Sequence, residues 1–376
     1  MVSHQLAIAV VLLPNLINLL KYTFFQSNQS HTLFLFFSYN NLSLIFQISE
    51  SIDAQEDKIM AEQEFQDIVD QEYENDHFND ENMTNGHEAE TIEQIIESCK
   101  IHDEKFPKHK LEAVKWGYFE RLNTNMSLVH DWSKQFPCGC GSRQSPIDIK
   151  ISDCQQASFA PLVLKTDKKD LESLSNGGMG VKYQCKGRSE LSGGPLQKGD
   201  TYVLEQFHFH WGANDTVGSE HLLNGEAYPC ELHCVYYNKK YGNFMNALSH
   251  GDGLCVVGVF IKVQENDNPG YQPVIEMLKQ VKFPDTSTNF NGEFSIEEMM
   301  PADKQHFSHY EGSLTTPPLS ESVMWINLLD EVGISQKQLE VFRCLMNPAG
   351  KPLVDNYRPV QPIHERKVHL QSKAQQ

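Results

Sequence analysis

Three histidines are spaced so that their imidazole rings could converge on one metal ion. His208 and His210 flank Phe209 in a strand-like run, and residues i and i+2 of an extended strand project to the same face. His233 follows far enough along the chain to return on a neighbouring antiparallel strand. Three neutral imidazole nitrogens with a fourth position left open are the ligand set of a catalytic zinc, whereas structural zinc sites are closed.

Polar residues two positions before the histidines favour this zinc interpretation over a simpler one. A His-x-His pair in a strand often consists of hydrogen-bonded or surface histidines that bind no metal. Here Glu231 precedes His233 by two residues, and Gln206 stands in the same relation to His208. Each partner shares the face of its histidine and can accept the ring N–H, which fixes the tautomer and the orientation of a metal ligand.

A hydroxyl-bearing loop and a nearby carboxylate have the groups that a zinc-bound water requires. The loop 312–318 reads GSLTTPP, and Glu220 lies between the two histidine-bearing runs. A hydroxyl that accepts a hydrogen bond from a zinc hydroxide and donates one to a buried carboxylate orients the reactive lone pair. Thr315 and Glu220 fit these two roles, while a TTPP segment taken alone also fits an ordinary turn.

The elements that must carry these side chains are mainly strands. Apolar and alternating runs predict strands over 201–211, 231–237, 254–263 and 322–329. The run 254–261 is continuously apolar, which is typical of a strand buried on both faces. Helices are predicted over 273–281 and 335–345, and Ser335 with Gln338 forms a helix-start signal of the capping-box type.

Seven segments of the chain resemble the alpha-class carbonic anhydrases, in the family's order and at compatible spacings from about residue 111 to about residue 370. They are KWGY (115–118), RQSPIDI (143–149), FHFHWG (207–212), SEH (219–221), ELH (231–233), GSLTTPP (312–318) and NYRPVQP (356–362). The resemblance implies an α+β, mostly β fold. Its features would be a large central, mainly antiparallel twisted sheet, short surface helices, and zinc at the base of a conical cleft.

The resemblance also implies an enzyme, a carbonic anhydrase with zinc as cofactor. A zinc-bound hydroxide would hydrate carbon dioxide reversibly to bicarbonate and a proton, and would hydrolyse activated esters weakly. The metal ligands would be His208, His210 and His233. Thr315 would be the hydroxyl beside the metal, with Glu220 as its partner, and the backbone N–H of Thr315 would hold the substrate oxygen.

Two further sets of residues match the walls of the family's site. The apolar wall that holds carbon dioxide corresponds to Val235, Val256, Leu314 and Trp325. The polar wall that carries water corresponds to Thr316, which also borders the substrate pocket, and to Gln206, Asn176 and Tyr118. Aliphatic surface suits an uncharged linear substrate, while hydroxyls and amides suit a chain of water molecules.

The chain departs from the fastest relatives at the proton shuttle, which is a histidine just after an Asn-Gly pair. Here Asn176 and Gly177 are followed by Gly178, and no histidine occurs between His130 and His208. We therefore assign no shuttle. The expected enzyme is slower, limited by proton transfer and rescued by small imidazole buffers.

An acidic arm precedes the expected catalytic domain, which spans 111–370 and is followed by a short tail, 371–376. Residues 52–110 are rich in acidic and amide side chains, and the whole chain has a formal charge of −19. Such a segment buries too little apolar surface to fold alone, so the arm should be largely disordered. The charge also argues against a nucleic-acid partner, because such proteins present basic surfaces.

One part of the acidic arm has the pattern of an amphipathic helix. Ile92, Ile95, Ile96 and Cys99 fall at i, i+3, i+4 and i+7. This short helix would dock on the catalytic domain or bind a partner, and the sequence does not identify that partner.

The first 51 residues contain two apolar runs, at 6–20 and 33–46. Neither reaches the roughly 18 uninterrupted apolar residues of a membrane-spanning helix, so membrane attachment is not expected. The segment is interpreted as a poor signal peptide, a weak anchor, or an over-extended reading frame whose true start is Met60, and the last is favoured.

The cysteines favour a cytoplasmic protein, with secretion as the alternative if residues 1–20 act as a signal peptide. Secreted relatives join the segment before QSPI to the residue after TTPP by a disulfide. Here Cys138 and Cys140 could supply one partner, but the other position is Leu319. The absence of this bridge favours a reducing compartment.

Two other functions compete with the zinc lyase. A non-catalytic, carbonic-anhydrase-related binding protein would usually lack at least one of the three histidines, and all three are present. A metalloprotease would require His-Glu-x-x-His on a helix, and the sequence lacks that motif.

Overall fold

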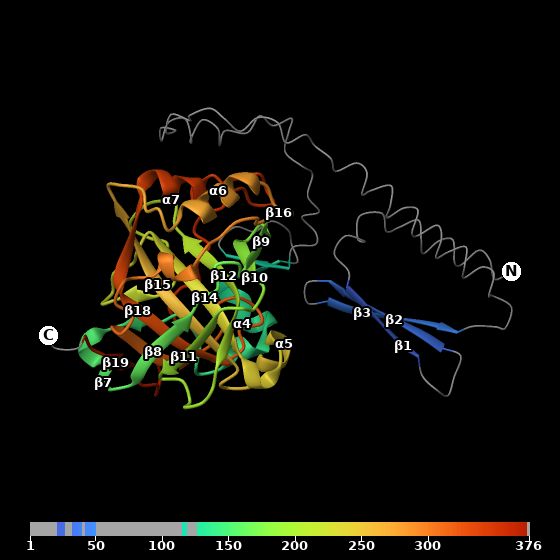
Figure 1. Cartoon of the computed structure of the whole chain (residues 1–376), viewed down its shortest axis with the longest axis horizontal. Coiled ribbons are helices and arrows are strands. Elements are labelled where there is room, and N and C mark those ends of the chain that lie inside the picture. The colour runs from blue at the N-terminus through green and yellow to red at the C-terminus, as the bar shows by residue number, and fades with distance from the viewer. Residues whose placement is uncertain (1–20, 27–31, 40–41, 50–114, 119–125, 374–376) are drawn as a thin grey trace. The chain divides into compact units, whose positions relative to one another are not determined.

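The computed structural model describes residues 21–26, 32–39, 42–49, 115–118 and 126–373 (Figure 1). The chain divides into two compact units, Met1–Gly86 and His87–Gln376. Most of the acidic arm, including its expected amphipathic helix at 92–99, lies outside the described residues.

The first unit contains a three-stranded antiparallel sheet in the order β1-β2-β3. Its strands are β1 (Lys21–Gln26), β2 (Thr32–Tyr39) and β3 (Leu42–Ser49). The second apolar run therefore forms most of the β2–β3 pair, which fits its many aromatic residues. In the part of the chain that the structure describes, no helix is long and apolar enough to cross a membrane.

The second unit is built on a twelve-stranded sheet with the order β16-β9-β10-β12-β14-β15-β18-β17-β19-β7, while β11 pairs with β12 and with β8. Its strands are β7 (Gln155–Gln156), β8 (Ala160–Lys165), β9 (Leu171–Asn176), β10 (Val181–Cys185), β11 (Glu190–Gly194), β12 (Tyr202–Trp211), β14 (Cys230–Asn238), β15 (Leu254–Gln264), β16 (Thr286–Asn289), β17 (Phe307–Gly312), β18 (Val323–Ser335) and β19 (His369–Gln371).

Shorter elements surround this sheet. Two small sheets pair β4 (Trp116–Gly117) with β5 (Ser127–Leu128) and β6 (Asp148–Ile149) with β13 (Leu222–Leu223). The helices are α4 (Trp132–Gln135), α5 (Phe244–Ala247), α6 (Gln272–Gln280) and α7 (Gln336–Arg343), and the 3₁₀ turns are η4 (Val129–Asp131), η5 (Pro137–Cys140), η6 (Ile151–Asp153), η7 (Lys239–Tyr241) and η8 (Ile296–Met299).

The expectation of a mainly antiparallel sheet needs a correction, because the large sheet is mixed. The ladder from β10 through β12 and β14 to β15 is antiparallel, but β15 and β18 run parallel, as do β19 and β7. A parallel neighbour requires a crossover connection, and the chain between β15 and β18 includes α6, β16 and β17. Strand direction across so long a connection leaves no local pattern in the sequence.

The predicted strands and helices of this unit are confirmed, with one difference in length. Strands β12, β14 and β15 match the expected runs within about two residues, whereas β18 continues to Ser335 instead of ending at 329. Polar Asp330 and Glu331 interrupt the apolar pattern there. Helix α7 begins with the predicted capping box, in which the Ser335 hydroxyl accepts from the Gln338 backbone N–H and the Gln338 side chain accepts from the Ser335 backbone N–H.

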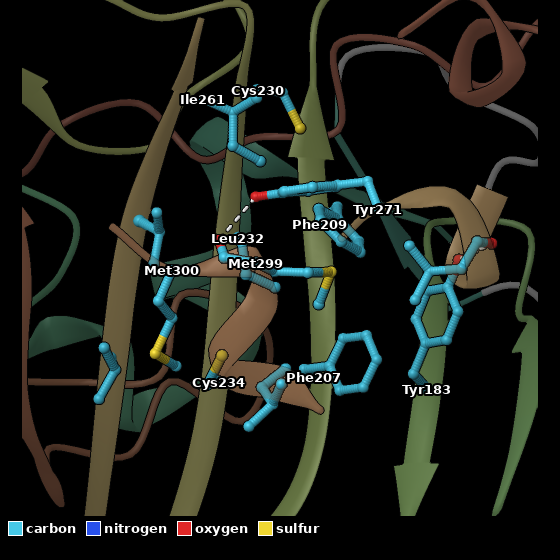
Figure 2. Packing of buried hydrophobic residues seen from close by; sticks show 14 of the residues in the cluster. Tyr183, Phe207, Phe209, Cys230, Leu232, Cys234, Ile261, Tyr271, Met299 and Met300 are labelled. Atoms are coloured by element: carbon cyan, nitrogen blue, oxygen red, sulfur yellow. Dashed lines mark hydrogen bonds between the residues drawn. The ribbon is translucent and has the colours of Figure 1, made fainter. Parts of the chain in front are cut away.

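One face of the sheet packs into the larger apolar core. Phe207 and Phe209 of β12 project to this face, where Phe207 stacks on Tyr183 with ring centroids 4.6 Å apart. Figure 2 shows these rings in one layer with Tyr271, whose hydroxyl donates to the backbone oxygen of Met299. Helices α6 and α7 lie over the same end of the sheet in Figure 1 and contribute Leu278, Leu339 and Phe342 to this core.

The opposite face carries a second, smaller core. Its buried members include Val235 of β14, Val256 of β15, Trp325 of β18 and Tyr310 of β17. Side chains of a strand alternate between the two faces, so this is also the face to which His208 and His210 project. The candidate metal site therefore lies on the smaller core's side of the sheet.

Candidate metal centre

Strand register places two of the histidines directly beside each other. His208 of β12 pairs with His233 of β14, and His210 pairs with Glu231. Directly paired residues have Cβ atoms about 4.5–5.5 Å apart on the same face. The three imidazole rings accordingly have centroids 4.6–5.3 Å apart.

Each ring uses one nitrogen to donate a hydrogen bond to an oxygen of the protein. His208 Nδ1 lies 2.8 Å from Gln206 Oε1, and His210 Nδ1 lies 2.7 Å from the backbone oxygen of Asn356. His233 uses its other nitrogen, because its Nε2 lies 2.7 Å from Glu231 Oε1. Carbonyl and carboxylate oxygens only accept, so these ring nitrogens carry the protons.

The remaining nitrogens of the three rings therefore keep their lone pairs and point to a common region. One ligand atom from each of His208, His210 and His233 falls within 4.8 Å of the others. His210 Nε2 is buried and has no hydrogen-bond partner in the described structure. Three convergent imidazole lone pairs, one of them left without a partner, fit a zinc ion, for which neutral nitrogen is a preferred ligand.

Burial keeps these imidazoles neutral. It lowers the pKa of His210 to about 3, and it lowers the pKa of His208 well below the ordinary value, with the other two rings adding to the effect on His208. The pKa of His233 is also lowered, mainly by burial and against the opposing influence of Glu231. A neutral imidazole is the form that binds a metal without first losing a proton.

A carboxylate lies against the open side of the three rings. Glu220 Oε2 is 3.4 Å from His210 Nε2 and 3.9 Å from His233 Nδ1. Glu220 Oε1 accepts from the Arg358 backbone N–H at 2.7 Å. Burial raises the pKa of Glu220 well above its usual range, while the neighbouring Thr315 side chain and the Arg358 backbone N–H oppose that rise. Glu220 Oε2 itself has no hydrogen-bond partner among the described residues.

The loop that carries Thr315 is fixed by its neighbour, Ser313. The Ser313 hydroxyl accepts from the Ser145 backbone N–H, and the Ser313 N–H donates to the Ser145 hydroxyl, both at 3.0 Å. The Trp325 ring N–H donates to the Ser313 backbone oxygen, also at 3.0 Å. Thr315 is buried. The backbone carbonyl of Thr316 accepts a hydrogen bond from the Leu319 N–H, which closes a turn after Thr315.

The apolar residues of the expected substrate wall form one row beside the histidines. Val235 pairs with Val256, and Val256 pairs with Trp325, across β14, β15 and β18. Val235 is two residues from His233 and so projects to the same face. Leu314 packs against this group. The structure thus brings the apolar residues together next to the three imidazoles.

The residues expected to carry water are placed less uniformly. Gln206 lies beside His208. Burial raises the pKa of Tyr118 well above its usual value, and the nearby Glu220 carboxylate adds to this rise, so Tyr118 lies close to Glu220. Asn176 is buried, and its side chain donates to the Val281 backbone oxygen and accepts from the Gly178 N–H. Its amide therefore holds the turn after β9.

Gly178, which stands where fast relatives have the proton-shuttle histidine, has a backbone conformation that favours glycine. Gly178 has a φ of +81°, and a Cβ added there would lie 2.7 Å from Cγ of Pro348. At the preceding Gly177, the nearest atom to an added Cβ is the Gly180 oxygen at 3.8 Å. A side chain is thus strained at Gly178 but sterically accommodated at Gly177.

Sequence reasoning missed several groups that orient the site. His221 joins Glu231 to the protein interior, because its Nδ1 lies 2.7 Å from Glu231 Oε1 and its Nε2 lies 2.7 Å from the Tyr310 hydroxyl. Burial would raise the pKa of Glu231, but His221 and His233 hold it well below the usual range. His221 follows Glu220 directly, and no periodic pattern marked it.

Comparison with known proteins gives a consistent result. The family model described as eukaryotic-type carbonic anhydrase matches residues 127–372. A curated relative named carbonic anhydrase 7, from Mus musculus, is 38% identical over 268 residues, which cover 69% of this chain and 98% of the relative. The Homo sapiens protein of the same name is 40% identical over 268 residues, with the same coverage of both chains.

Proposed function

Because the chain belongs to the eukaryotic-type carbonic anhydrase family, we propose that it is an active zinc enzyme that hydrates carbon dioxide reversibly to bicarbonate and a proton. The observation that carries this proposal is the set of three convergent imidazoles, each held by a hydrogen bond through its other nitrogen. Their ligand nitrogens would be Nε2 of His208, Nε2 of His210 and Nδ1 of His233.

When bound, zinc lowers the pKa of a water ligand from 15.7 to about 7 and so supplies a nucleophile near neutral pH. The protein's contribution is to hold the three rings neutral and correctly turned. Gln206, Glu231 and the Asn356 carbonyl do this by accepting the outer ring N–H groups. Such outer partners typically change metal affinity or activity about 10- to 100-fold when they are removed.

Thr315 and Glu220 would orient the nucleophile. If the Thr315 hydroxyl donates its proton to Glu220, only its oxygen lone pairs remain to face the metal position. The hydroxyl would then accept a hydrogen bond from the nucleophile and so fix its orientation. The Thr315 backbone N–H would hold the substrate oxygen. The influence of the Thr315 side chain on the pKa of Glu220, the unpartnered Oε2 of Glu220 and the anchoring of the loop through Ser313 support this assignment.

Carbon dioxide would lie against the row formed by Val235, Val256 and Trp325, with Leu314 beside it, at the base of a conical cleft. An uncharged linear molecule needs no polar contact there, and aliphatic surface stabilises it by excluding water. The proposal is supported by the strand register, which pairs Val235 with Val256 and Val256 with Trp325, two residues along β14 from His233. Thr316, Gln206 and Tyr118 would border the path of water on the other side.

Proton release would limit turnover. The segment after Asn176 has Gly177 and Gly178 where fast relatives have a histidine, and no histidine occurs from 131 to 207. A protein without a titratable group near pH 7 on this path must pass its proton to buffer molecules that diffuse into the site. Small imidazole buffers should therefore accelerate the enzyme.

The decisive experiment is stopped-flow hydration of carbon dioxide by the purified full chain, with zinc content measured on the same sample. We expect one zinc per chain and turnover that rises with imidazole concentration. Zinc without turnover would contradict the enzymatic proposal and favour a non-catalytic binding protein. Turnover that does not depend on buffer concentration would leave the enzymatic proposal intact. It would contradict only the proposal that the protein lacks a proton-shuttle residue.

We further propose a division of the chain into an N-terminal segment (1–51), an acidic arm (52–110), a catalytic domain (111–370) and a tail (371–376). The proposed activity would serve pH homeostasis in the cytoplasm, with weak hydrolysis of activated esters as a side reaction. Seven cysteines among the described residues, Cys138 and Cys140 included, are free thiols, and this supports a reducing compartment.

One observation opposes the cytoplasmic assignment, because Cys344 is disulfide-bonded. Cell fractionation combined with thiol counting under denaturing conditions tests the compartment. Recovery in the soluble cytoplasmic fraction with nine reactive thiols would support a cytoplasmic protein. Secretion with fewer than nine thiols would contradict it.

A further inference from the structure

A lysine lies directly beside the metal centre on the neighbouring strand. Lys182 of β10 pairs with His208 of β12 in an antiparallel register. Across the other edge of β10 it pairs with Ser175 of β9, which in turn pairs with Ser287 of β16. One row of side chains therefore runs across the sheet from His233 through His208 and Lys182 to two serines.

The alternation of β10 fixes the face on which Lys182 stands. Its neighbours Val181 and Tyr183 are buried in the larger core, where Tyr183 stacks on Phe207. Adjacent residues of a strand point to opposite faces, so Lys182 shares the face of His208. The Lys182 side chain is exposed, and His208 is the least buried of the three histidines.

The positive charge of Lys182 lies on the face of the metal site and forms no ion pair with a carboxylate of the described residues. None of the ion pairs among the described residues includes Lys182, and its neighbours on this face, Ser175 and Gln184, are uncharged. The nearby Glu205 interacts with the Gln184 amide.

We propose that Lys182 is an anion-attracting residue of the metal centre, which strengthens the binding of bicarbonate and of small monovalent anions that compete for the same position. This inference rests on the proposed function, because the anion would occupy the open position of the metal. Carbon dioxide carries no charge and gains nothing from the lysine. Lys182 would therefore distinguish the charged product from the uncharged substrate.

The expected effect is modest and depends on salt. For an exposed lysine in a water-like environment with an effective dielectric constant of about 40–80, two charges about 8–10 Å apart attract by an amount that corresponds to a roughly two- to fivefold change in affinity. The Debye length is about 8 Å at 0.15 M ionic strength and about 30 Å at 0.01 M. Removal of the charge should therefore weaken anion binding more at low salt than at physiological salt.

Isothermal titration calorimetry of the zinc-loaded full chain with thiocyanate tests this inference. Lys182→Gln should raise the dissociation constant about two- to fivefold, with the larger change at about 0.01 M ionic strength. Lys182→Arg should keep the affinity within about 1.5-fold of the wild type, because it keeps the charge. Lys198→Gln is the matched control, since Lys198 is exposed in the loop before β12, remote from the histidines.

The outcomes separate this inference from the proposed enzymatic activity. Thiocyanate binding that weakens in Lys182→Gln alone supports the role of Lys182 even if the protein does not hydrate carbon dioxide. Equal dissociation constants in Lys182→Gln and the wild type would overturn it. An equal effect of Lys198→Gln, or no thiocyanate binding to the zinc-loaded wild type, would overturn it as well.

Discussion

The two faces of strand β12 are made of adjacent residues but serve opposite purposes. Phe207 and Phe209 are buried in a dry aromatic layer, where area removed from water stabilises the fold. On the other face, His208 is partly buried and His210 is fully buried, and the Nε2 atom of His210 has no hydrogen-bond partner among the described residues. Buried polar atoms without partners destabilise a protein.

The difference shows how one strand can carry both stability and chemistry. The aromatic face fixes the position of the backbone, and the histidine face uses that fixed backbone to hold its rings in place. Substitutions on the two faces should therefore separate two measurable quantities, which are the free energy of unfolding and the affinity for metal. The following changes test that separation.

Loss of a ligand should give the largest effect. His210→Ala removes one of three imidazoles, and we expect zinc binding and carbon dioxide hydration to be lost together. The sheet should remain folded, because the strand is held by its other face. Zinc content, hydration rate and circular dichroism of the variant check this. A variant that unfolds would show that the two faces are not separable.

The matched change on the other face is Phe209→Ala. Truncation of a fully buried phenylalanine typically destabilises a protein by about 3–5 kcal/mol, and Phe209 is 1% exposed. The fraction of the variant that remains folded should still bind one zinc per chain. Chemical denaturation followed by metal analysis measures both effects. Loss of zinc from the folded fraction would contradict the separation of the faces.

A histidine on the aromatic side should make stability depend on pH. His309 of β17 is 8% exposed and donates through Nδ1 to the Trp325 backbone oxygen, and burial lowers its pKa to about 4. The unfolded state therefore binds more protons between pH 6.5 and pH 4, and stability falls as the pH falls through this range. The loss should total about 3 kcal/mol.

This contribution is isolated by comparing the wild type with His309→Gln in urea denaturation at several pH values. The difference in unfolding free energy between the two proteins should change by about 3 kcal/mol from pH 7 to pH 4. Parallel pH dependences of the two proteins would show that His309 is not the responsible group.

Orientation without ligation is tested by Thr315→Ala. The variant should retain its zinc, because no metal ligand is removed, while turnover should fall about 100-fold, as when one oriented hydrogen-bonding group is removed from an active site. Thr316→Ala is the neighbouring control and should reduce turnover less. An unchanged rate in Thr315→Ala would remove this residue from the proposed mechanism.

The smallest effect is expected at the partner of His208. Gln206→Ala should weaken zinc binding about tenfold, because the imidazole loses the oxygen that fixes its tautomer. The unfolding free energy of the zinc-free protein should change little, since Gln206 is partly exposed. Competition with a chelator of known affinity measures the change. Undiminished zinc affinity would contradict the orienting role of Gln206.

Much of the local structure could be predicted because it follows short periods along the chain. The strands that carry the three histidines and the capping box of α7 all leave such patterns, and the structure confirms these elements. The parallel pairing of β15 with β18 could not be predicted in this way. It depends on a connection of about 58 residues, and nothing within either strand records the direction of its neighbour.

The sequence by itself determined the three imidazoles and two of their partners, Gln206 and Glu231, because the two-residue period of a strand places i and i−2 on one face. Only the tertiary structure decided the rest of the support. The Asn356 carbonyl, the Arg358 N–H and the contact of His221 with Tyr310 come from distant segments. Every residue has a backbone carbonyl, and nearly every residue has an N–H, so side-chain identity cannot reveal which of them will meet a ligand.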